Sequence, residues 1–473
     1  MTTKQQIYMV DALCGSGKTH SAIQYAITLA AAGERVALIQ PTLQLSDQSE
    51  IAFRKQAGNH RIKITQINSD GSNSVKESIK THLHGTYDTG EILLITHSAW
   101  GLVCDDEWLN KEDWHLIIDE VPSIEKEFSR NVQDNHSVIT DFISLGGPDP
   151  SGYAEIKPKA HFKTAVEQMA LNRNKDEVSY IFRNLATWLV SPHWEVNVKA
   201  SSYNKLLAGD GKKLVAFAVL NPSIVAGFKS VTIMGALFKD TPLYIIWSQM
   251  EVDFVPHPDI HGTRFQQHTN GSLITFRYMH DRNFSKSLDR QHQVIDKMAA
   301  AVLTDVGEGK LLWVANKDKP KNPFISMGSR QTQLSNAPHG MNNNQDVHNI
   351  AFLSALNNSP AHCKFLESLG FSSDALKRAI ALQTTYQAMM RSSIRNPDDT
   401  DPKTVYVFDK EVADWSQVIF PGSSVEQMPG QQQLPKTKIG APKKPEKTKE
   451  EKEADQRERT ARCRENKKSK ISR

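Results

Sequence analysis

Residues 7–19 read IYMVDALCGSGKT, and this stretch decides the fold. It begins with the apolar residues 7–10, a short run bounded by polar positions, which predicts a buried strand. A turn with two glycines follows, and the residues from Lys18 to about Ala32 have helical character until Gly33. A strand, a glycine turn and a helix in direct succession predict the opening unit of a parallel α/β sheet.

The turn has the residues of a phosphate-binding loop. Its glycines let backbone N–H groups point at phosphate oxygens, and the helix N-terminus adds a favourable dipole. We expect Lys18 to reach the β- and γ-phosphates and the Thr19 hydroxyl to ligate Mg²⁺. Ala12 stands where the strict pattern has its first glycine, and a chance glycine-serine turn is the alternative interpretation. The residues expected to bind the nucleotide are Gly15, Ser16, Gly17, Lys18, Thr19 and His20.

Further apolar runs, separated by helical stretches, predict a parallel sheet covered on both faces. These runs are Arg35–Gln40, 92–96, 116–118, 230–235 and 243–247. Residues from about 126 to 212 interrupt the series with amphipathic stretches at 163–171 and 178–189, which predict a helical insertion. A second α/β series follows, with strands at 273–278, 310–315, 347–353 and 404–408 and helices at 292–305 and 373–391.

The predicted strand 116–118 ends in two carboxylates, Asp119 and Glu120. Ligands bind at the carboxyl edge of an open parallel sheet. We therefore expect Asp119 to hold Mg²⁺, through water, and Glu120 to orient and activate the attacking water. A strand followed by an ordinary acidic turn is the alternative interpretation.

Together these residues resemble a superfamily 2 helicase of the DEAD/DEAH-like group. The AxxGxGKT form of the phosphate loop is frequent there, and Asp119-Glu120-Val121-Pro122 resembles its DExx box. Residues 41–48 resemble the PTxxLxxQ element, residues 96–98 the next backbone-contacting motif, and residues 339–342 the RGxD-like element. The resemblance implies that nucleic acid is contacted by Pro41, Thr42, Thr96, His97 and Gly340.

Residues 387–395 resemble the QxxGRxxR element of the same family. On a helix, positions i, i+4 and i+8 lie near one face, so Gln387, Arg391 and Arg395 are expected to point together across an interdomain cleft. The resemblance implies that Arg391 or Arg395 acts as an arginine finger on the γ-phosphate. A solvated basic helix face is the alternative. Met234-Gly235-Ala236 stands where the family usually has Ser-Ala-Thr, which departs from the pattern.

The resemblance implies two RecA-like parallel-sheet domains with ATP and Mg²⁺ between them. The first is predicted over 1–250, with the helical insertion at about 126–212, and the second over 251–420. The implied activity is that of an ATP-dependent nucleic-acid helicase or translocase, acting on DNA in preference to RNA. A nucleotide-switched replication or mobile-element-associated factor that does not separate strands is the alternative. About ten residues precede the phosphate loop, which leaves no room for the upstream Q motif of DEAD-box RNA helicases.

The net charge of +4 hides a split along the chain. Residues 431–473 hold 15 Lys+Arg against 7 Asp+Glu, whereas the other 430 residues hold 42 against 46. No aromatic residue follows Phe420, so residues 421–473 are predicted to be a disordered basic tail that contacts nucleic acid or replication and mobile-element proteins. Four dispersed cysteines suggest the cytoplasm, and no apolar run reaches the roughly 20 residues of a membrane span.

Overall fold

The computed structural model describes residues 5–429, apart from 59, 69–73, 86–88, 102, 104–107, 109, 282–283, 285–287, 290–292, 317–321, 336–343 and 355–357. The described residues fall within one compact unit, residues 1–431. Gly340 and most of the predicted tail lie outside the described residues. No helix in the described part of the chain is long and apolar enough to cross a membrane.

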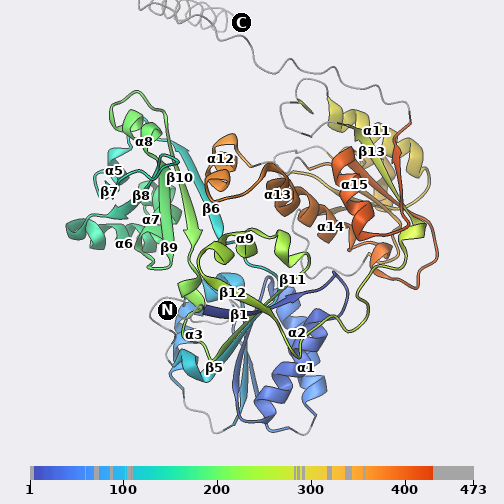
Figure 1. The fold of residues 1–473 in the computed structure, drawn as a ribbon, viewed down its shortest axis with the longest axis horizontal. Coiled ribbons are helices and arrows are strands. Elements are labelled where there is room, and N and C mark those ends of the chain that lie inside the picture. Colours follow the sequence, from blue (N-terminus) through green and yellow to red (C-terminus); the bar gives the residue numbers. More distant parts are fainter. Residues whose placement is uncertain are drawn as a thin grey trace, which may run out of the picture. The chain divides into compact units, whose positions relative to one another are not determined.

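The first domain is built on a seven-stranded parallel sheet in the order β12-β1-β11-β5-β2-β4-β3 (Figure 1). Side chains alternate between its faces. Along β2, Val36 and Leu38 pack in the core formed with α1 and α2, while Ala37 and Ile39 pack in the core that includes α3. Burial on both faces explains the continuous apolar runs in the sequence. The strands are β1 (Gln5–Asp11), β2 (Arg35–Gln40), β3 (Lys63–Gln66), β4 (Glu91–Thr96), β5 (Trp114–Ile118), β11 (Ser230–Gly235) and β12 (Val252–Pro256). The helices are α1 (Lys18–Ala31), α2 (Leu43–Ala57), α3 (Val75–Leu83), α4 (His97–Trp100) and α9 (Pro242–Gln249).

Strand pairing brings the ends of these strands to one edge of the sheet. Asp11 of β1 pairs with Gly235 of β11, and Ile39 of β2 pairs with Ile118 of β5. Because all the strands run in parallel, the loops after β1, β2, β4, β5 and β11 emerge at the same carboxyl edge. The predicted phosphate loop and the predicted carboxylates are therefore neighbours.

The predicted strand at 243–247 is wrong, because these residues belong to helix α9. The Thr241 hydroxyl accepts a hydrogen bond from the Tyr244 N–H at 3.3 Å, and Pro242 occupies the first turn, both of which favour a helix start. Leu243, Ile246 and Trp247 form the buried face at helical spacing. A five-residue apolar run has no periodicity that separates a strand from such a helix.

The insertion contains strands as well as the two predicted helices. Helices α6 (Lys163–Leu171) and α7 (Glu177–Val190) pack against an antiparallel sheet in the order β6-β10-β9-β8-β7. The strands are β6 (Glu125–Asn131), β7 (Ile143–Leu145), β8 (Tyr153–Pro158), β9 (Trp194–Lys199) and β10 (Lys213–Leu220), and the short helices are α5 (Ser137–Thr140) and α8 (Ala200–Leu207).

The second domain is a six-stranded parallel sheet in the order β15-β14-β16-β17-β13-β18. Its strands are β13 (Ile274–His280), β14 (Leu311–Val314), β15 (Gln331–Leu334), β16 (Asn349–Phe352), β17 (Lys403–Asp409) and β18 (Ser424–Gln427). Its helices are α11 (Val294–Val306), α12 (Pro360–Ser368), α13 (Ser373–Lys377), α14 (Gln383–Met389) and α15 (Lys410–Ile419), and a π-helical turn, Arg378–Leu382, joins α13 to α14. The four predicted strands are present, and β18 extends the sheet past residue 420.

Helix α12 of the second domain packs on the insertion (Figure 1). The Phe365 ring stacks on Phe217 of β10, with centroids 4.6 Å apart and planes 10° from parallel. His362 Nε2 lies 2.9 Å from Glu125 Oε2 on β6. The insertion therefore supplies a buried contact between the two domains, in addition to the site described below.

Asp409, at the end of β17, makes the stability of the second domain depend on pH. Burial raises the pKa of Asp409 to about 7, and its Oδ1 accepts a hydrogen bond from the Phe284 N–H at 3.0 Å. An unfolded carboxyl has a pKa of about 4. The folded protein thus binds the extra proton between about pH 4 and pH 7, and the free energy of unfolding falls as pH rises through that window.

We expect Asp409→Asn, which keeps an acceptor oxygen, to remove this group's slope of up to about 1.4 kcal/mol per pH unit. Urea unfolding at pH 5 and at pH 8 measures the slope, with the exposed Asp398→Asn variant as the control. An unchanged pH dependence in Asp409→Asn contradicts the assignment.

Candidate nucleotide-binding site

The loop between β1 and α1 depends on its glycines. Gly15 and Gly17 have φ angles of +81° and +96°, in the left-handed region that favours glycine. A β-carbon at Gly15 would lie 3.2 Å from Arg395 Cγ, and one at Gly17 would lie 2.3 Å from Thr263 Oγ1. Both conformation and close packing therefore require glycine at these positions.

Lys18 and Ser16 fix the loop by contacts to main-chain atoms. Lys18 is buried, and its Nζ donates to the carbonyls of Ala12 and Leu13 at 2.8 and 3.1 Å. The Ser16 carbonyl accepts from the backbone N–H groups of Thr263 and Arg264 at 2.8 and 2.9 Å. The segment that follows β12 therefore crosses directly over the glycine loop.

A hydrogen bond joins the two halves of the predicted Mg²⁺ site. Thr19 Oγ1 donates to Asp119 Oδ2 at 2.9 Å, across a sequence separation of 100 residues. Burial, and next the nearby Glu120 carboxylate, raise the pKa of Asp119 to about 6, while the Thr19 hydrogen bond and the Lys18 charge act in the opposite direction. The Asp119 carbonyl lies 3.0 Å from His97 Nε2. The Thr19 hydroxyl and the Asp119 carboxylate are oxygen ligands of the kind that Mg²⁺ prefers, so these two residues fit that ion.

Glu120 adopts an unusual backbone conformation for its residue type. Its φ of +64° lies in the left-handed region, which is uncommon outside glycine. The side chain lines the same cavity as the glycine loop and is partly exposed. Strained residues of this kind cluster at functional sites, so the conformation is compatible with the role predicted for Glu120.

The cavity, of about 290 Å³, is lined from both domains. The second domain contributes Gln387, Met390, Arg391 and Arg395, which face Lys18 and Thr19. Burial lowers the pKa of both Arg391 and Arg395. The positive charge of Arg395 lowers the pKa of Arg391 further, and the positive charge of Arg264 lowers the pKa of Arg395 further. Partly desolvated guanidinium groups form strong, charge-assisted hydrogen bonds to phosphate. The predicted nucleotide-binding residues Gly15, Gly17, Lys18, Thr19 and His20 line this cavity, and Ser16 is buried within the loop.

The predicted shared helix face is wrong in its geometry. Helix α14 ends at Met389, and Arg395 closes a separate 3₁₀ turn, Ser393–Arg395. The turn is held in place because the Ser393 N–H donates to the Val347 carbonyl at 3.0 Å. The two arginines therefore reach one cavity from a folded turn, not from consecutive turns of one helix.

Four of the residues predicted to contact nucleic acid lie at the ends of the adjacent strands β2 and β4, since Gln40 pairs with Thr96. Pro41 and Thr42 follow β2, Thr96 is the last residue of β4, and His97 follows it. Thr42 and Thr96 are helix N-caps: their hydroxyls accept from the N–H groups of Leu45 and Ala99 at 3.3 and 3.2 Å. Pro41, Thr42, Thr96 and His97 are all partly exposed at the carboxyl edge of the sheet.

Arg264 lines the cavity and was missed by sequence reasoning. It lies in the irregular segment after β12, which matches no motif, so no signal marked it. The cavity also includes Leu45, Gln48, Ser49 and Ala52 of α2.

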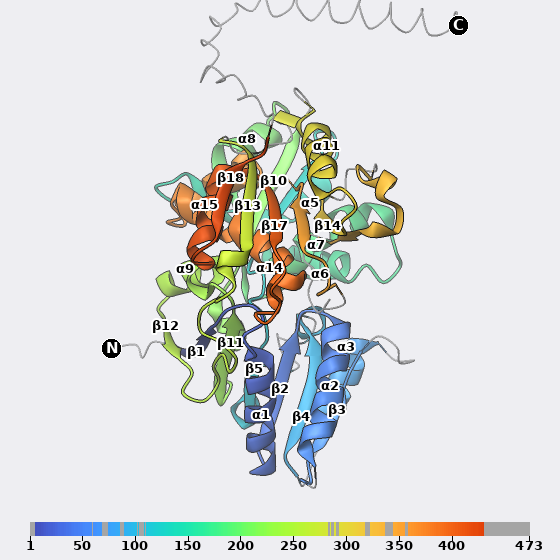
Figure 2. The ribbon, with the colours of Figure 1, turned by 90° about the vertical axis from the view of Figure 1, so that its right-hand side faces the viewer.

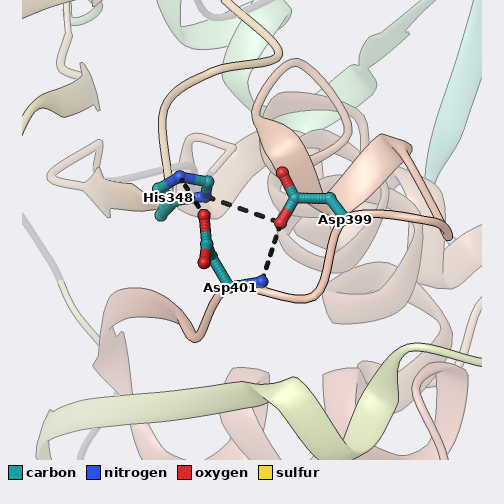
Figure 3. A group of neighbouring side chains, drawn as sticks. All are labelled: His348, Asp399 and Asp401. Atoms are coloured by element: carbon teal, nitrogen blue, oxygen red, sulfur yellow. Dashed lines mark hydrogen bonds and ion pairs between the residues drawn. The ribbon is translucent and has the colours of Figure 1, made fainter.

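Figure 3 shows a second group that sequence reasoning missed, His348, Asp399 and Asp401, with one potential ligand atom each within 4.8 Å of the others. The buried Lys403 ammonium already donates to Asp399 Oδ1 at 2.7 Å, which supplies a cation to the group. His348 Nδ1 lies 2.8 Å from the Ser393 hydroxyl. The group therefore supports the turn that carries Arg395 and is better explained by ion pairing than by a metal.

A glycine loop after the first strand and carboxylates after a nearby strand, in two parallel-sheet domains, define the P-loop class with RecA-like domains. Residues 2–144 match the family model described as DEAD/DEAH box helicase. This stretch is therefore similar to that family, which confirms the predicted resemblance, and the predicted fold class is confirmed as well.

A search of solved structures finds matches at low sequence identity. A structure described as XPD_Helicase is 11% identical, with 89% of this chain and 96% of that chain covered and a TM-score of 0.52. Dbp5 of S. cerevisiae bound to RNA and ADP BeF3 is 8% identical, with coverages of 90% and 85% and a TM-score of 0.41. RecG bound to a three-way DNA junction is 11% identical, with coverages of 88% and 42% and a TM-score of 0.38. No curated protein matches the chain.

Replacement of Gly17 by alanine tests the packing of the loop. Gly33 has a similar φ of +92° but no heavy atom within 4 Å of an added β-carbon, so Gly33→Ala adds only the left-handed strain of about 1–2 kcal/mol. We expect Gly17→Ala to lower the unfolding midpoint more than Gly33→Ala and to weaken binding of a fluorescent ATP analogue, which Gly33→Ala leaves unchanged. Equal effects of the two substitutions on binding would show that the contact with Thr263 is unimportant.

Proposed function

We propose that the chain is an ATP-dependent nucleic-acid helicase or translocase that hydrolyses ATP between its two RecA-like domains. The observation that carries the proposal is the composition of one cavity. Lys18 and Thr19 line it from the first domain, with the buried Asp119 bonded to Thr19, and Arg391 and Arg395 line it from the second. This division supports a reaction that proceeds only when the two domains are closed on the nucleotide.

Each side chain has a role that its position supports. The glycine loop and Lys18 bind the phosphates, with N–H groups and one ammonium. Thr19 and Asp119 would hold Mg²⁺, which would supply positive charge to the phosphates. Glu120 accepts a proton from the attacking water, and Gln387 orients that water. Arg391 and Arg395 stabilise the charge that develops on the transferred phosphoryl group.

The proposed path of the nucleic acid follows the carboxyl edge of the first sheet, where Pro41, Thr42, Thr96 and His97 are exposed in part. His97 contacts the main chain of Asp119, so a strand bound there is one side chain away from the Mg²⁺ site. We propose that the chain binds DNA in preference to RNA. The basic residues 431–473 add a second, salt-sensitive contact with the nucleic acid.

ATP hydrolysis measured with single-stranded DNA, duplex DNA and RNA tests the proposal. We expect nucleic acid to stimulate the wild-type protein and Lys18→Ala to lose at least about 100-fold in kcat, because electrostatic stabilisation of this kind is usually a large term. Lys55→Ala, on the exposed end of α2, is the control. Hydrolysis that no nucleic acid stimulates rejects the helicase, and equal activity of Lys18→Ala rejects the site.

The same assay identifies the arginine finger. We expect Arg391→Ala and Arg395→Ala each to reduce kcat, with the larger loss, about 10³-fold, at the finger itself. Arg54→Ala, an exposed arginine of α2, is the control. A loss of the same size in the control means that general charge, not position, is responsible.

A strand-displacement assay separates this proposal from a nucleotide-switched factor that does not unwind. Met234-Gly235-Ala236 in place of the usual Ser-Ala-Thr favours the second candidate, since that element couples hydrolysis to strand separation in the family that the sequence resembles. ATP hydrolysis without displacement of a strand identifies the switched factor.

A further inference from the structure

Two buried side chains of helix α14 form hydrogen bonds with main-chain atoms of the first domain. Gln383 Nε2 donates to the carbonyls of Ala236 and Leu237 at 3.0 and 2.8 Å. The Tyr386 hydroxyl accepts a hydrogen bond from the Cys14 N–H, inside the glycine loop, at 3.0 Å. Gln383 and Tyr386 are three residues apart and so lie on one helix face, and both are buried, at 8% and 0% exposure.

The two loops that α14 contacts are themselves connected. The Ala12 N–H donates to the Gly235 carbonyl at 3.2 Å, and the Phe238 N–H donates to Asp11 Oδ1 at 2.9 Å. Leu237 has a φ of +51°, so the loop after β11 is in a strained conformation. A shift of the glycine loop is therefore transmitted to both contacts of α14.

The direction of the Tyr386 hydrogen bonds is fixed by its neighbours. His268 Nε2 lies 2.7 Å from the hydroxyl, and burial lowers the pKa of His268 to about 4, which leaves the ring neutral. Since the hydroxyl accepts from Cys14, its single proton is donated to His268. Loss of the hydroxyl removes both bonds and leaves a buried N–H of the glycine loop without its partner.

The arginines follow α14 directly. Arg391 lies two residues beyond the end of the helix, and the Ile394 carbonyl accepts from Asn270 Nδ2 at 2.9 Å, which holds the turn that carries Arg395. Figure 2 shows α14 at the carboxyl edge of the first sheet, above α1 and β5. The π-helical turn Arg378–Leu382 precedes α14, and such turns often occur at functional sites because they rotate the residues that follow.

We propose that Gln383 and Tyr386 are positioning residues that couple the glycine loop and the loop after β11 to the placement of Arg391 and Arg395. The proposal rests on the proposed hydrolysis of ATP. Gln383 contacts the loop after β11 through the main-chain carbonyls of Ala236 and Leu237, so this contact needs no side-chain hydroxyl in that loop. A misplacement of about 1 Å at the reacting group is enough to cost roughly 100-fold in rate.

The test uses Gln383→Met, which keeps the length and packing of the side chain, and Tyr386→Phe. We expect each to lower kcat for ATP at least 10-fold and to leave KM within twofold, because Lys18 and Thr19 still bind the phosphates. Thr384→Val is the matched control: its hydroxyl bonds only to the Ile380 carbonyl within the same stretch of helix, at 2.8 Å. Thermal unfolding is measured for all three variants.

A double-mutant cycle decides how the two residues act. If Gln383 acts by placing the arginines, Gln383→Met has no further effect on kcat in an Arg391→Ala, Arg395→Ala background. An undiminished effect in that background overturns the proposal, as does a loss of kcat that tracks a lowered unfolding midpoint. The proposal is also overturned if the wild-type protein hydrolyses ATP and both single variants remain fully active. If the wild-type protein does not hydrolyse ATP, the proposed function is overturned, and this proposal with it.

Discussion

The hydrogen bond between Thr19 and Asp119 is the contact on which the site depends. Asp119 is 1% exposed, so its carboxylate forms hydrogen bonds with protein groups in place of water. Loss of any of these bonds would leave a buried polar atom without a partner, which is costly. Gln40 Nε2, 3.4 Å away, is the other side chain that donates to it. These partners come from α1 and β2, and Asp119 follows β5. The order of strands in the sheet, in which β5 and β2 are neighbours, is therefore what makes a buried acid possible here.

Left-handed backbone conformations are concentrated at the same edge of the sheet. Gly15 and Gly17 adopt them without strain, whereas Glu120 and Leu237 are strained, and all four residues lie in loops that follow parallel strands. The strands fix these loops at one side. Helix α14 fixes two of them at the other side, because Tyr386 bonds to the glycine loop and Gln383 bonds to the loop after β11. Backbone that is strained and fixed at both ends has little freedom to relax, which suits groups that must be placed to within about 0.5 Å.

The sequence identified the fold where its patterns were long or carried chemistry. Arg35–Gln40 was predicted to the residue because β2 is buried on both faces and so is apolar throughout. In contrast, β6 reads EKEFSRN and buries only Phe128, so no apolar pattern marked the antiparallel sheet of the insertion. The predicted helix 373–391 ends close to the end of α14, but the separate turn that carries Arg395 was not predicted. Long-range contacts with the segment before β16, such as that of Ser393 with Val347, hold this turn.

The arrangement of cations explains why the two halves of the site need a common ligand. Lys18, Arg391 and Arg395 line one cavity, and the guanidinium groups of Arg391 and Arg395 are largely removed from water. Like charges that are close and poorly solvated repel, so closure of the cavity is costly unless an anion is enclosed. A nucleotide polyphosphate, which brings several negative charges to the glycine loop, is such an anion. In the proposed function, binding and cleavage of that nucleotide alter the charge balance between the domains, and the two states of the cavity therefore differ in free energy.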